Sequence, residues 1–316
     1  MLISFNDLPG WHDDTLSSIE PALFYSAPAV LRNESLKHWH PFYHAVQALA
    51  PHQRNEENWR QLIQRYLRPY REGGDAKMHF TGYYEPLLQG ALQQGGVYQT
   101  PLYALPNTQD TQFKIPRSAI VNGALAGKGL ELVWVDDAIA AFFLQIQGSG
   151  RVQLKDGNVL RLGYAGTNGH AYTPIGKTLI ARGALLAEDV SLQSISQWLK
   201  DHSEAAEDVM SDNQSYVFFQ LLQGEGPIGT QGVPLTAGRS LAVDQNHLDL
   251  GSLLWVDIPH SLQKDTNLQR VMIAQDTGGA IKGAFRGDYF WGFGEDAEQC
   301  AGVMNVKGRC FRLLPA

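Results

Sequence analysis

The sequence predicts a mainly β protein that also contains helices in two blocks. Its 316 residues include 32 glycines and 15 prolines, a composition that favours short strands joined by many turns. Strand patterns occupy residues 90–161 and return after residue 213, whereas apolar residues at helical spacing occur in 35–70 and 173–210. At this length we expect roughly two domains.

Composition narrows the possible partners and locations. The chain is 44% hydrophobic and 18% charged, which is typical of a soluble globular protein, and its net charge of −7 disfavours nucleic acid as a partner. No apolar run approaches the roughly 18 residues that span a bilayer. The N-terminus has no basic n-region and no long apolar segment. We therefore expect either a cytosolic protein or a mature domain whose signal was removed.

The first region combines an irregular start with two helices. Residues 2–30 contain Pro9, Pro21 and Pro28 and are expected to be irregular. In 35–50 the apolar spacing predicts a helix whose regular part begins at Pro41. Residues 55–70 predict a second helix, capped by Asn55 and ended by Pro69. Packing or surface roles are expected for the nearby histidines, since no carboxylate or cysteine completes a metal site; they are His38, His40, His44 and His52.

The middle of the chain predicts first strands and then helices. Residues 79–86 predict a strand in which Glu85 either lines a sugar site or is exposed. Further strands are expected at 97–105, 130–135, 140–147 and 151–154, with a hairpin turn at 156–157. Residues 145–150 predict a strand running into a Gly-Ser-Gly turn that fits neither a phosphate loop nor a nucleophile elbow.

The second helical block follows a polar loop at 164–170. Thr173 is expected to cap a helix that has Pro174 at its first position and ends before Gly183. Further helices are predicted at 189–200 and 203–210, and strands at 216–220, 240–243, 252–258 and 270–275. Cys300 and Cys310 either pair across a hairpin or are free thiols, and we favour free thiols.

The stretch 274–294 carries the strongest chemical signal. Asp276 and Asp288 enclose Lys282 and Arg286, six glycines punctuate the stretch, and three aromatic residues follow the second aspartate. A carboxyl beside aromatic side chains and away from water can keep its proton near neutral pH and act as a general acid. The alternative is a strand, a turn and a strand in which Asp276 caps the turn and Asp288 is solvated. Residue types alone leave both readings open.

Six stretches taken together resemble one family. They are FTGYYEP (80–86), FLQIQGSG (143–150), YAGTNGHAYTPIGK (164–177), NQSYVFF (213–219), VPLTAGR (233–239) and the whole of 274–294. In this order they are similar to the membrane-bound lytic murein transglycosylase A (MltA) family. The resemblance runs from about residue 80 to the C-terminus.

The resemblance implies a fold and a location. A double-psi β-barrel catalytic domain would comprise residues 1–87 and 213–316, and an inserted, smaller β-domain would comprise 88–212, with a glycan groove between them. Family members act in the periplasm, usually as lipoproteins of the outer membrane, although this sequence has no lipobox cysteine. Peptidoglycan glycan strands are the implied partner, other cell-wall enzymes are further candidates, and we expect a monomer.

The resemblance also implies a mechanism. Family members cleave the β-1,4 bond between N-acetylmuramic acid and N-acetylglucosamine without water and form a 1,6-anhydro product. Asp288 matches the catalytic aspartate, acting first as acid and then as base, and Asp276 matches a supporting aspartate. Substrate positioning is expected from these residues: Thr81, Tyr83, Tyr84, Gln147, Gly148, Ser149, Gly150 and Lys282. No metal or cofactor is implied.

Three alternatives remain open. A glycoside hydrolase would use Asp288 and Asp276 with water and would release reducing ends. A non-catalytic glycan-binding module would bind without cleaving. A cytosolic enzyme of unrelated chemistry is favoured only by the missing signal.

Overall fold

The computed structural model describes residues 1–71, 73, 77–107, 114–224 and 226–316. The chain divides into two compact units. The first comprises Met1–Tyr84, Ile228–Gly292 and Gln299–Ala316, and the second comprises Glu85–Pro227 and Phe293–Glu298. The predicted boundaries at 87/88 and 212/213 therefore lie a few to about fifteen residues from the observed crossings, and the assignment of the first unit as the catalytic domain stays a prediction.

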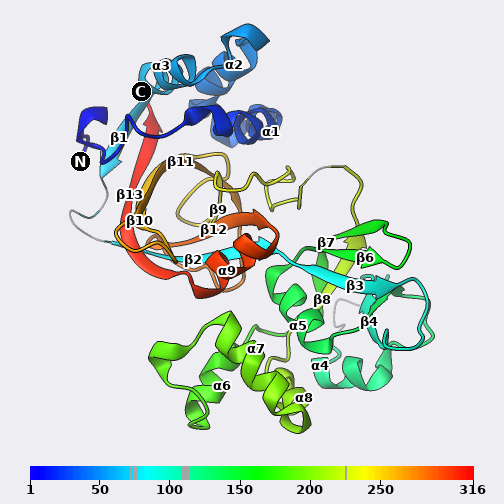
Figure 1. The fold of residues 1–316 in the computed structure, drawn as a ribbon. Coiled ribbons are helices and arrows are strands. Elements are labelled where there is room, and N and C mark those ends of the chain that lie inside the picture. The colour runs from blue at the N-terminus through cyan, green and yellow to red at the C-terminus, as the bar shows by residue number, and fades with distance from the viewer. Residues whose placement is uncertain (72, 74–76, 108–113, 225) are drawn as a thin grey trace. The chain divides into compact units, whose positions relative to one another are not determined.

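The first unit is built on a sheet that closes on itself (Figure 1). The strand order is β1-β13-β10-β11-β9-β12-β2, and β2 also pairs with β13, so that six strands form a closed ring and β1 extends it. Closure satisfies the backbone groups that an open edge would leave unpaired. The strands are β1 (Leu67–Arg71), β2 (Met78–Glu85), β9 (Ser240–Val243), β10 (Leu253–Pro259), β11 (Asn267–Asp276), β12 (Arg286–Phe293) and β13 (Asn305–Pro315).

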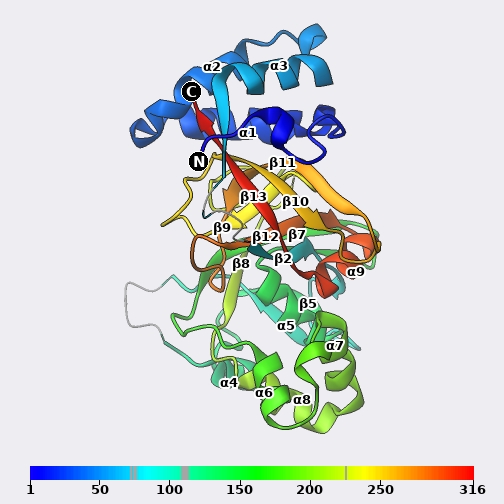
Figure 2. The same ribbon diagram turned by 90° about the vertical axis from the view of Figure 1, so that its left-hand side faces the viewer.

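Three helices cover one side of this sheet, as Figures 1 and 2 both show. They are α1 (Glu20–Leu31), α2 (His40–Ala48) and α3 (Glu56–Tyr66). Side chains alternate along β10, so Trp255 packs among the buried residues of the helices while Leu254 and Val256 fill the inside of the ring. The first unit thus has two cores that share the same strands.

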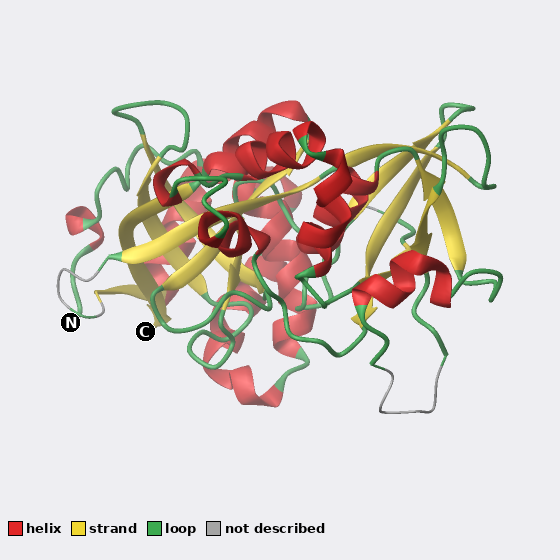
Figure 3. Ribbon diagram, turned by 90° about the horizontal axis from the view of Figure 1, so that it is seen from below, coloured by secondary structure: helices red, strands yellow, loops and turns green. Residues whose placement is uncertain are grey.

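The second unit has its own six-stranded sheet, in the order β4-β5-β3-β6-β7-β8. Figure 3 shows a separate group of strands for each unit. The strands are β3 (Leu87–Ala91), β4 (Thr100–Tyr103), β5 (Glu131–Val135), β6 (Gly150–Leu154), β7 (Val159–Thr167) and β8 (Val217–Leu221). The helices are α4 (Arg117–Ala119), α5 (Ala138–Gln147), α6 (Ile175–Ala181), α7 (Leu192–Asp201) and α8 (Ser203–Ser211), and α9 (Glu295–Val303) contains the last crossing between the units.

Buried polar groups explain two of the sequence motifs of the second unit. The side chain of Asn168 donates to the carbonyls of Ile115 and Gln214, each at 2.8 Å, and accepts from the amide of Tyr216 at 2.9 Å. Arg117 is buried and donates to the carbonyl of Asn213 at 2.8 Å. Because these side chains satisfy loop backbone that water cannot reach, the motifs around residues 168 and 213 have a structural role.

The structure corrects several predicted elements. Residues 140–147 form helix α5 instead of a strand, because the carboxylate of Asp137 caps the amides of Ile139 and Ala140 at 2.8 and 3.0 Å. Residues 20–31 were expected to be irregular but form α1, which has Pro21 in its first turn and tolerates Pro28 near its end.

Other corrections concern helix ends. The helix predicted for 55–70 ends at Tyr66, and Pro69 lies in β1; its cap, Asn55, is confirmed by the bond from the Asn58 amide at 3.0 Å. Thr173 does not cap α6, whose N-cap position is Pro174. Part of the loop predicted at 164–170 belongs to β7. The hairpin at 156–157 is confirmed. Cys300 and Cys310 do not pair with each other in a disulfide, as favoured from the sequence.

Candidate active site

The two aspartates of the glycine-rich stretch lie on one rung of the closed sheet. Asp276 ends β11 and is paired with Ala242 of β9, and Asp288 of β12 is paired with the same alanine from the other side. With strands about 4.8 Å apart, the two aspartate backbones are separated by roughly 10 Å. The small side chain of Ala242 lies between them and is buried.

Asp288 has one oxygen engaged and one available. Its Oδ1 accepts a hydrogen bond from the hydroxyl of Thr81, and Nη2 of Arg286 donates to the same hydroxyl at 2.7 Å. In the described part of the chain, Oδ2 has no hydrogen-bond partner. Asp288 therefore presents one carboxyl oxygen to whatever occupies the space in front of it.

The surroundings of Asp288 raise the pKa of its carboxyl to about 6. Burial is the largest cause, and the hydrogen bond from Thr81 and the charge of Arg286 oppose it, while the charge of Asp276 adds to the increase. A carboxyl with a pKa near 6 is protonated often enough at neutral pH to donate a proton and is ionised easily enough to take one back. The side chain of Asp288 is partly buried, so the fully solvated Asp288 of the alternative is not observed.

Asp276 is held much more tightly than Asp288. Its Oδ1 accepts from the amide of Thr230 at 2.9 Å, from the hydroxyl of Thr230 at 3.0 Å and from the amide of Thr277 at 2.9 Å. Its Oδ2 accepts from the hydroxyl of Tyr83 at 3.2 Å. Burial raises the pKa of Asp276, and the bonds from Thr230, Thr277 and Tyr83 oppose that increase. A carboxylate so fully engaged is suited to electrostatic support and not to attack on a substrate.

Strand β2 brings two predicted site residues to the rung. Thr81 and Tyr83 are two residues apart, so both point to the face that carries Asp288 and Asp276. The ring of Tyr83 also packs on Phe290 of β12, with 5.0 Å between ring centroids. Phe290 lies two residues after Asp288 on β12 and therefore on the same face.

Gly82 allows β2 to pack closely against Ala301 and Trp291, on the face of the strand opposite Thr81 and Tyr83. A Cβ atom at this position would lie 2.8 Å from the Cα of Ala301 in α9 and 2.8 Å from Nε1 of Trp291. Only glycine fits there, which explains its place between the two site residues.

Two other predicted site residues lie away from the rung. Tyr84 is buried and alternates to the face opposite Tyr83. Lys282 is exposed, and its charge acts on Asp244, whose pKa is lowered mainly by the amide of Gly283 and also by Lys282. No contact with either aspartate supports the predicted role of Lys282 in substrate binding.

The four predicted residues 147–150 belong to the second unit. Gln147 ends α5, and Gly148 caps it in a left-handed conformation, with φ 81° and a bond from its amide to Leu144 O at 2.9 Å. Gly150 begins β6, where a Cβ would lie 2.2 Å from Leu144 Cδ1. Chain geometry thus accounts for both glycines, and substrate contact by Gln147, Gly148, Ser149 and Gly150 stays a prediction.

Three residues near these elements were missed or misread in the sequence. Glu85 is 1% exposed and forms ion pairs with Arg151 at 2.7 Å and Arg161 at 3.7 Å, so it neither lines a site nor faces solvent. Thr230 contacts Asp276 and Arg286 contacts Thr81, and neither was given a role from the sequence. Arg286 lies two residues before Asp288 on β12, whereas only tertiary structure brings Thr230 to the site. A short Gly-Thr-Gln-Gly segment is the sole sequence signal at Thr230.

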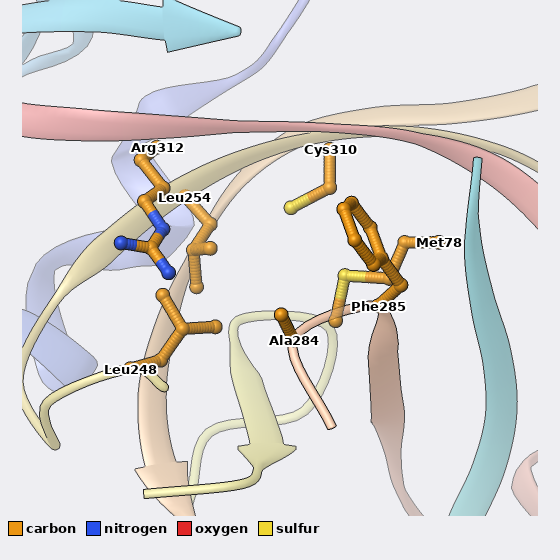
Figure 4. A pocket seen from close by; sticks show the side chains of 7 residues that line it. All are labelled: Met78, Leu248, Leu254, Ala284, Phe285, Cys310 and Arg312. Carbon is orange, nitrogen blue, oxygen red and sulfur yellow. The ribbon is translucent and has the colours of Figure 1, made fainter. Parts of the chain in front are cut away.

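A small cavity in the first unit is separate from the aspartates (Figure 4). Its volume is about 20 Å³, space for a single water-sized molecule. The lining is mostly apolar and consists of Met78, Leu248, Leu254, Ala284, Phe285, Cys310 and Arg312. A sugar ring does not fit there.

Comparisons with known proteins agree on one family. Residues 79–220 match the MltA specific insert domain, and residues 239–314 match the 3D domain. The chain is 37% identical over 256 residues to membrane-bound lytic murein transglycosylase A of Escherichia coli K12, covering 78% of this chain and 68% of that protein. It is 34% identical over 249 residues to the protein of the same name in Vibrio cholerae, covering 76% and 67%.

Solved structures show the same fold. A membrane-bound lytic murein transglycosylase from Agrobacterium tumefaciens superposes with a TM-score of 0.89 at 31% identity, covering 99% of this chain and 97% of that one. The E. coli MltA structure with bound chitohexaose gives a TM-score of 0.78 at 32% identity, covering 94% and 90%. The predicted fold class, a double-psi β-barrel with an inserted β-domain, is confirmed by this likeness.

Proposed function

Since the chain belongs to the MltA family of lytic transglycosylases, we propose that it cleaves peptidoglycan glycan strands between N-acetylmuramic acid and N-acetylglucosamine without water. The muramoyl 6-hydroxyl attacks its own anomeric carbon, and a 1,6-anhydro ring forms as the β-1,4 bond breaks. The E. coli relative with bound chitohexaose supports a β-1,4-linked glycan as the ligand.

One observation carries the mechanism: Asp288 has a pKa of about 6 and one carboxyl oxygen without a partner in the described chain. Protonated Asp288 donates to the leaving glycosidic oxygen as the bond to the anomeric carbon breaks. The resulting carboxylate then accepts the proton of the 6-hydroxyl as that oxygen bonds to the anomeric carbon. The proton count balances over the cycle, and Asp288 ends in its starting state.

Asp276 supports this cycle without entering it. Its four hydrogen bonds keep its charge fixed, and that charge raises the pKa of Asp288 and opposes early loss of the proton. The same negative charge stabilises the oxocarbenium-like positive charge that develops on the muramoyl ring.

The hydrolase alternative predicts different products. A retaining hydrolase needs its second carboxylate free to attack, whereas every hydrogen bond of Asp276 holds it in place. An inverting hydrolase needs a water activated by the second carboxylate. Both release reducing ends in place of anhydro ends, and a binding module releases nothing.

Mass spectrometry of the muropeptides released from purified peptidoglycan tests the proposal. Wild type is expected to release products one water lighter than hydrolysis products, and Asp288→Asn is expected to release none. Reducing-end products would establish a hydrolase on this scaffold. Absence of any release from a folded wild type, with retained binding to peptidoglycan, would favour the binding module.

The substrate implies where the protein acts. The curated relatives are named as membrane-bound proteins, and no helix in the described ranges is long and apolar enough to cross a membrane. We place the protein in the periplasm, where peptidoglycan is exposed, with attachment to the outer membrane in the form made by the cell. Fractionation of cells that express the natural gene tests this placement, and recovery in the cytosol would contradict it.

A further inference from the structure

The guanidinium of Arg286 is held at the edge of the aspartate rung by several acceptors. Its Nη2 donates to the hydroxyl of Thr81 at 2.7 Å, and its Nη1 donates to the carbonyl of Gly287 at 3.1 Å and to that of His79 at 3.5 Å. The side chain is partly buried, and burial lowers the pKa of Arg286 while the charge of Asp288 opposes that decrease. The group is fixed by its contacts with β2 and β12.

These contacts determine the direction of the hydrogen bond between Thr81 and Asp288. A guanidinium has donors only, so the Thr81 hydroxyl must act as the acceptor toward Arg286. The hydroxyl carries one hydrogen, which is then directed to Oδ1 of Asp288. Without Arg286 the hydroxyl is able to turn and accept a proton from a protonated Asp288.

We propose that Arg286 is a positioning residue that fixes Thr81 as a hydrogen-bond donor, so that Oδ1 of Asp288 remains an acceptor and Oδ2 carries the reacting proton. The inference rests on the proposed role of Asp288 as acid and base. It assigns the two carboxyl oxygens different tasks: Oδ1 anchors the group, and Oδ2 faces the substrate. A proton placed on Oδ1 would point to Thr81 and away from the glycosidic bond.

The same chain of bonds adjusts the acidity of Asp288. The charged or titratable groups that act on Asp288 are Arg286 of its own strand, Asp276 of β11 and Tyr83 of β2, and the β9 residue on this rung is Ala242. Arg286 and Thr81 favour the carboxylate, whereas burial and Asp276 favour the protonated form. Loss of either Arg286 or Thr81 as a donor therefore raises the pKa of Asp288, which makes the protonated carboxyl a weaker acid toward the leaving oxygen in the first step and the carboxylate a stronger base in the second.

The pH dependence of turnover measures this effect. The alkaline limb of the pH profile of kcat reports the pKa of the acid in the enzyme–substrate complex. We expect this limb to move to higher pH by roughly one unit in Arg286→Gln and in Thr81→Val. Thr81→Ser keeps the hydroxyl and should retain the wild-type limb. Lys307→Gln is the matched control, because it removes an exposed positive charge from the position of β13 that pairs with His79.

The double variant separates the relay from a simple effect of charge. If Arg286 acts partly through Thr81, the limb of Arg286→Gln with Thr81→Val should move by less than the sum of the two single shifts, because only the direct effect of the Arg286 charge remains once the hydroxyl is gone. If the pH shifts of the two single variants add in full in the double variant, Arg286 does not act through Thr81. An unchanged alkaline limb in Arg286→Gln would also overturn the proposal. Thermal unfolding of each variant checks that it is folded, and Thr81→Val still tests the donor if Arg286→Gln does not fold.

A failure of the Arg286 proposal can be told apart from a failure of the proposed transglycosylase activity. If wild type releases anhydro products but the alkaline limb of the kcat profile does not move in Arg286→Gln, the role of Arg286 is refuted and the transglycosylase activity stands. Reducing-end products from wild type would refute the proposed function, whatever the limb does.

Discussion

Asp276 and Asp288 share a single neighbour, since both pair with Ala242 from opposite sides of β9. One carboxylate on this rung accepts four hydrogen bonds, while the other accepts a single bond, from Thr81, in the described chain. The difference in their surroundings gives two chemically identical groups different tasks. Four predictions follow from this and from the packing around it.

Replacement of Asp276 should move the pH optimum toward acid. Its negative charge raises the pKa of Asp288, so Asp276→Asn should lower that pKa and shift the alkaline limb of kcat to lower pH. Turnover at pH 7 should fall by roughly 10–100-fold, within the range of a supporting electrostatic group. Kinetics between pH 4.5 and 8 check this, with the exposed Asp249→Asn as control. A limb displaced to higher pH would contradict the assigned electrostatic role.

Asp288→Asn should lose activity and gain stability. The loss in kcat is expected to reach about 10³-fold or more, because the variant has no acid. A buried carboxyl with a raised pKa stabilises the fold below about pH 4, and this contribution is lost as pH rises toward the folded pKa of about 6. The variant should therefore be more stable than wild type by about 1–3 kcal/mol at pH 7.5 and differ little at pH 4. Urea unfolding of both proteins at both pH values measures this. An equal difference in the free energy of unfolding at pH 4 and at pH 7.5 would show that ionisation of Asp288 does not affect stability.

Gly82→Ala should disturb the site from the opposite face of β2. The added Cβ meets the backbone of Ala301 at 2.8 Å, and backbone cannot move as easily as a side chain. We expect a loss of about 1–3 kcal/mol in the free energy of unfolding. Activity should fall as well, because β2 must shift and carries Thr81 with it. Gly96→Ala is not a clean control, since its φ is 56°; Gly279→Ala, which has open space, is the better comparison.

Asp14→Asn should unfold the protein more readily than any surface change. Both oxygens of Asp14 bind Arg239, at 2.8 and 2.5 Å, and one also accepts from the Val271 amide at 2.8 Å. Loss of one partner leaves a buried guanidinium uncompensated, at a cost of about 3–5 kcal/mol. Chemical denaturation is the measurement, with exposed Asp13→Asn as the matched control. Similar midpoints for the two variants would show that the ion pair contributes little.

The sequence predicted strand β9 of the first unit but not helix α5 of the second. Residues 240–243 form β9 as expected, because a short apolar run bounded by turns is a reliable strand signal. Helix α5 was predicted to be a strand because its residues are apolar on nearly every side and show no helical period. The Asp137 cap decides the outcome there, and its effect is local and easily overlooked.

The site was predictable only where local motifs reach it. Asp276, Asp288, Thr81 and Tyr83 lie in two short motifs, and the structure brings these four together. Thr230 lies just outside the motif at 233–239, and the tertiary structure brings it to Asp276, 46 residues further along the chain. No periodicity in one sequence reports such a contact.

The strand order of the first unit has a consequence for how the chain acquires its structure during synthesis. Strand β13 closes the ring by pairing with both β10 and β2, so the ring cannot close until residues 305–313 have been synthesised. The second unit is encoded almost entirely by residues 85–227 and is complete apart from a short return. We expect it to fold first while the earlier strands wait unpaired, since distant strand pairing is slow. A nascent chain that lacks β13 would then keep a folded insert and an open ring, with both aspartates present in a barrel that is still incomplete.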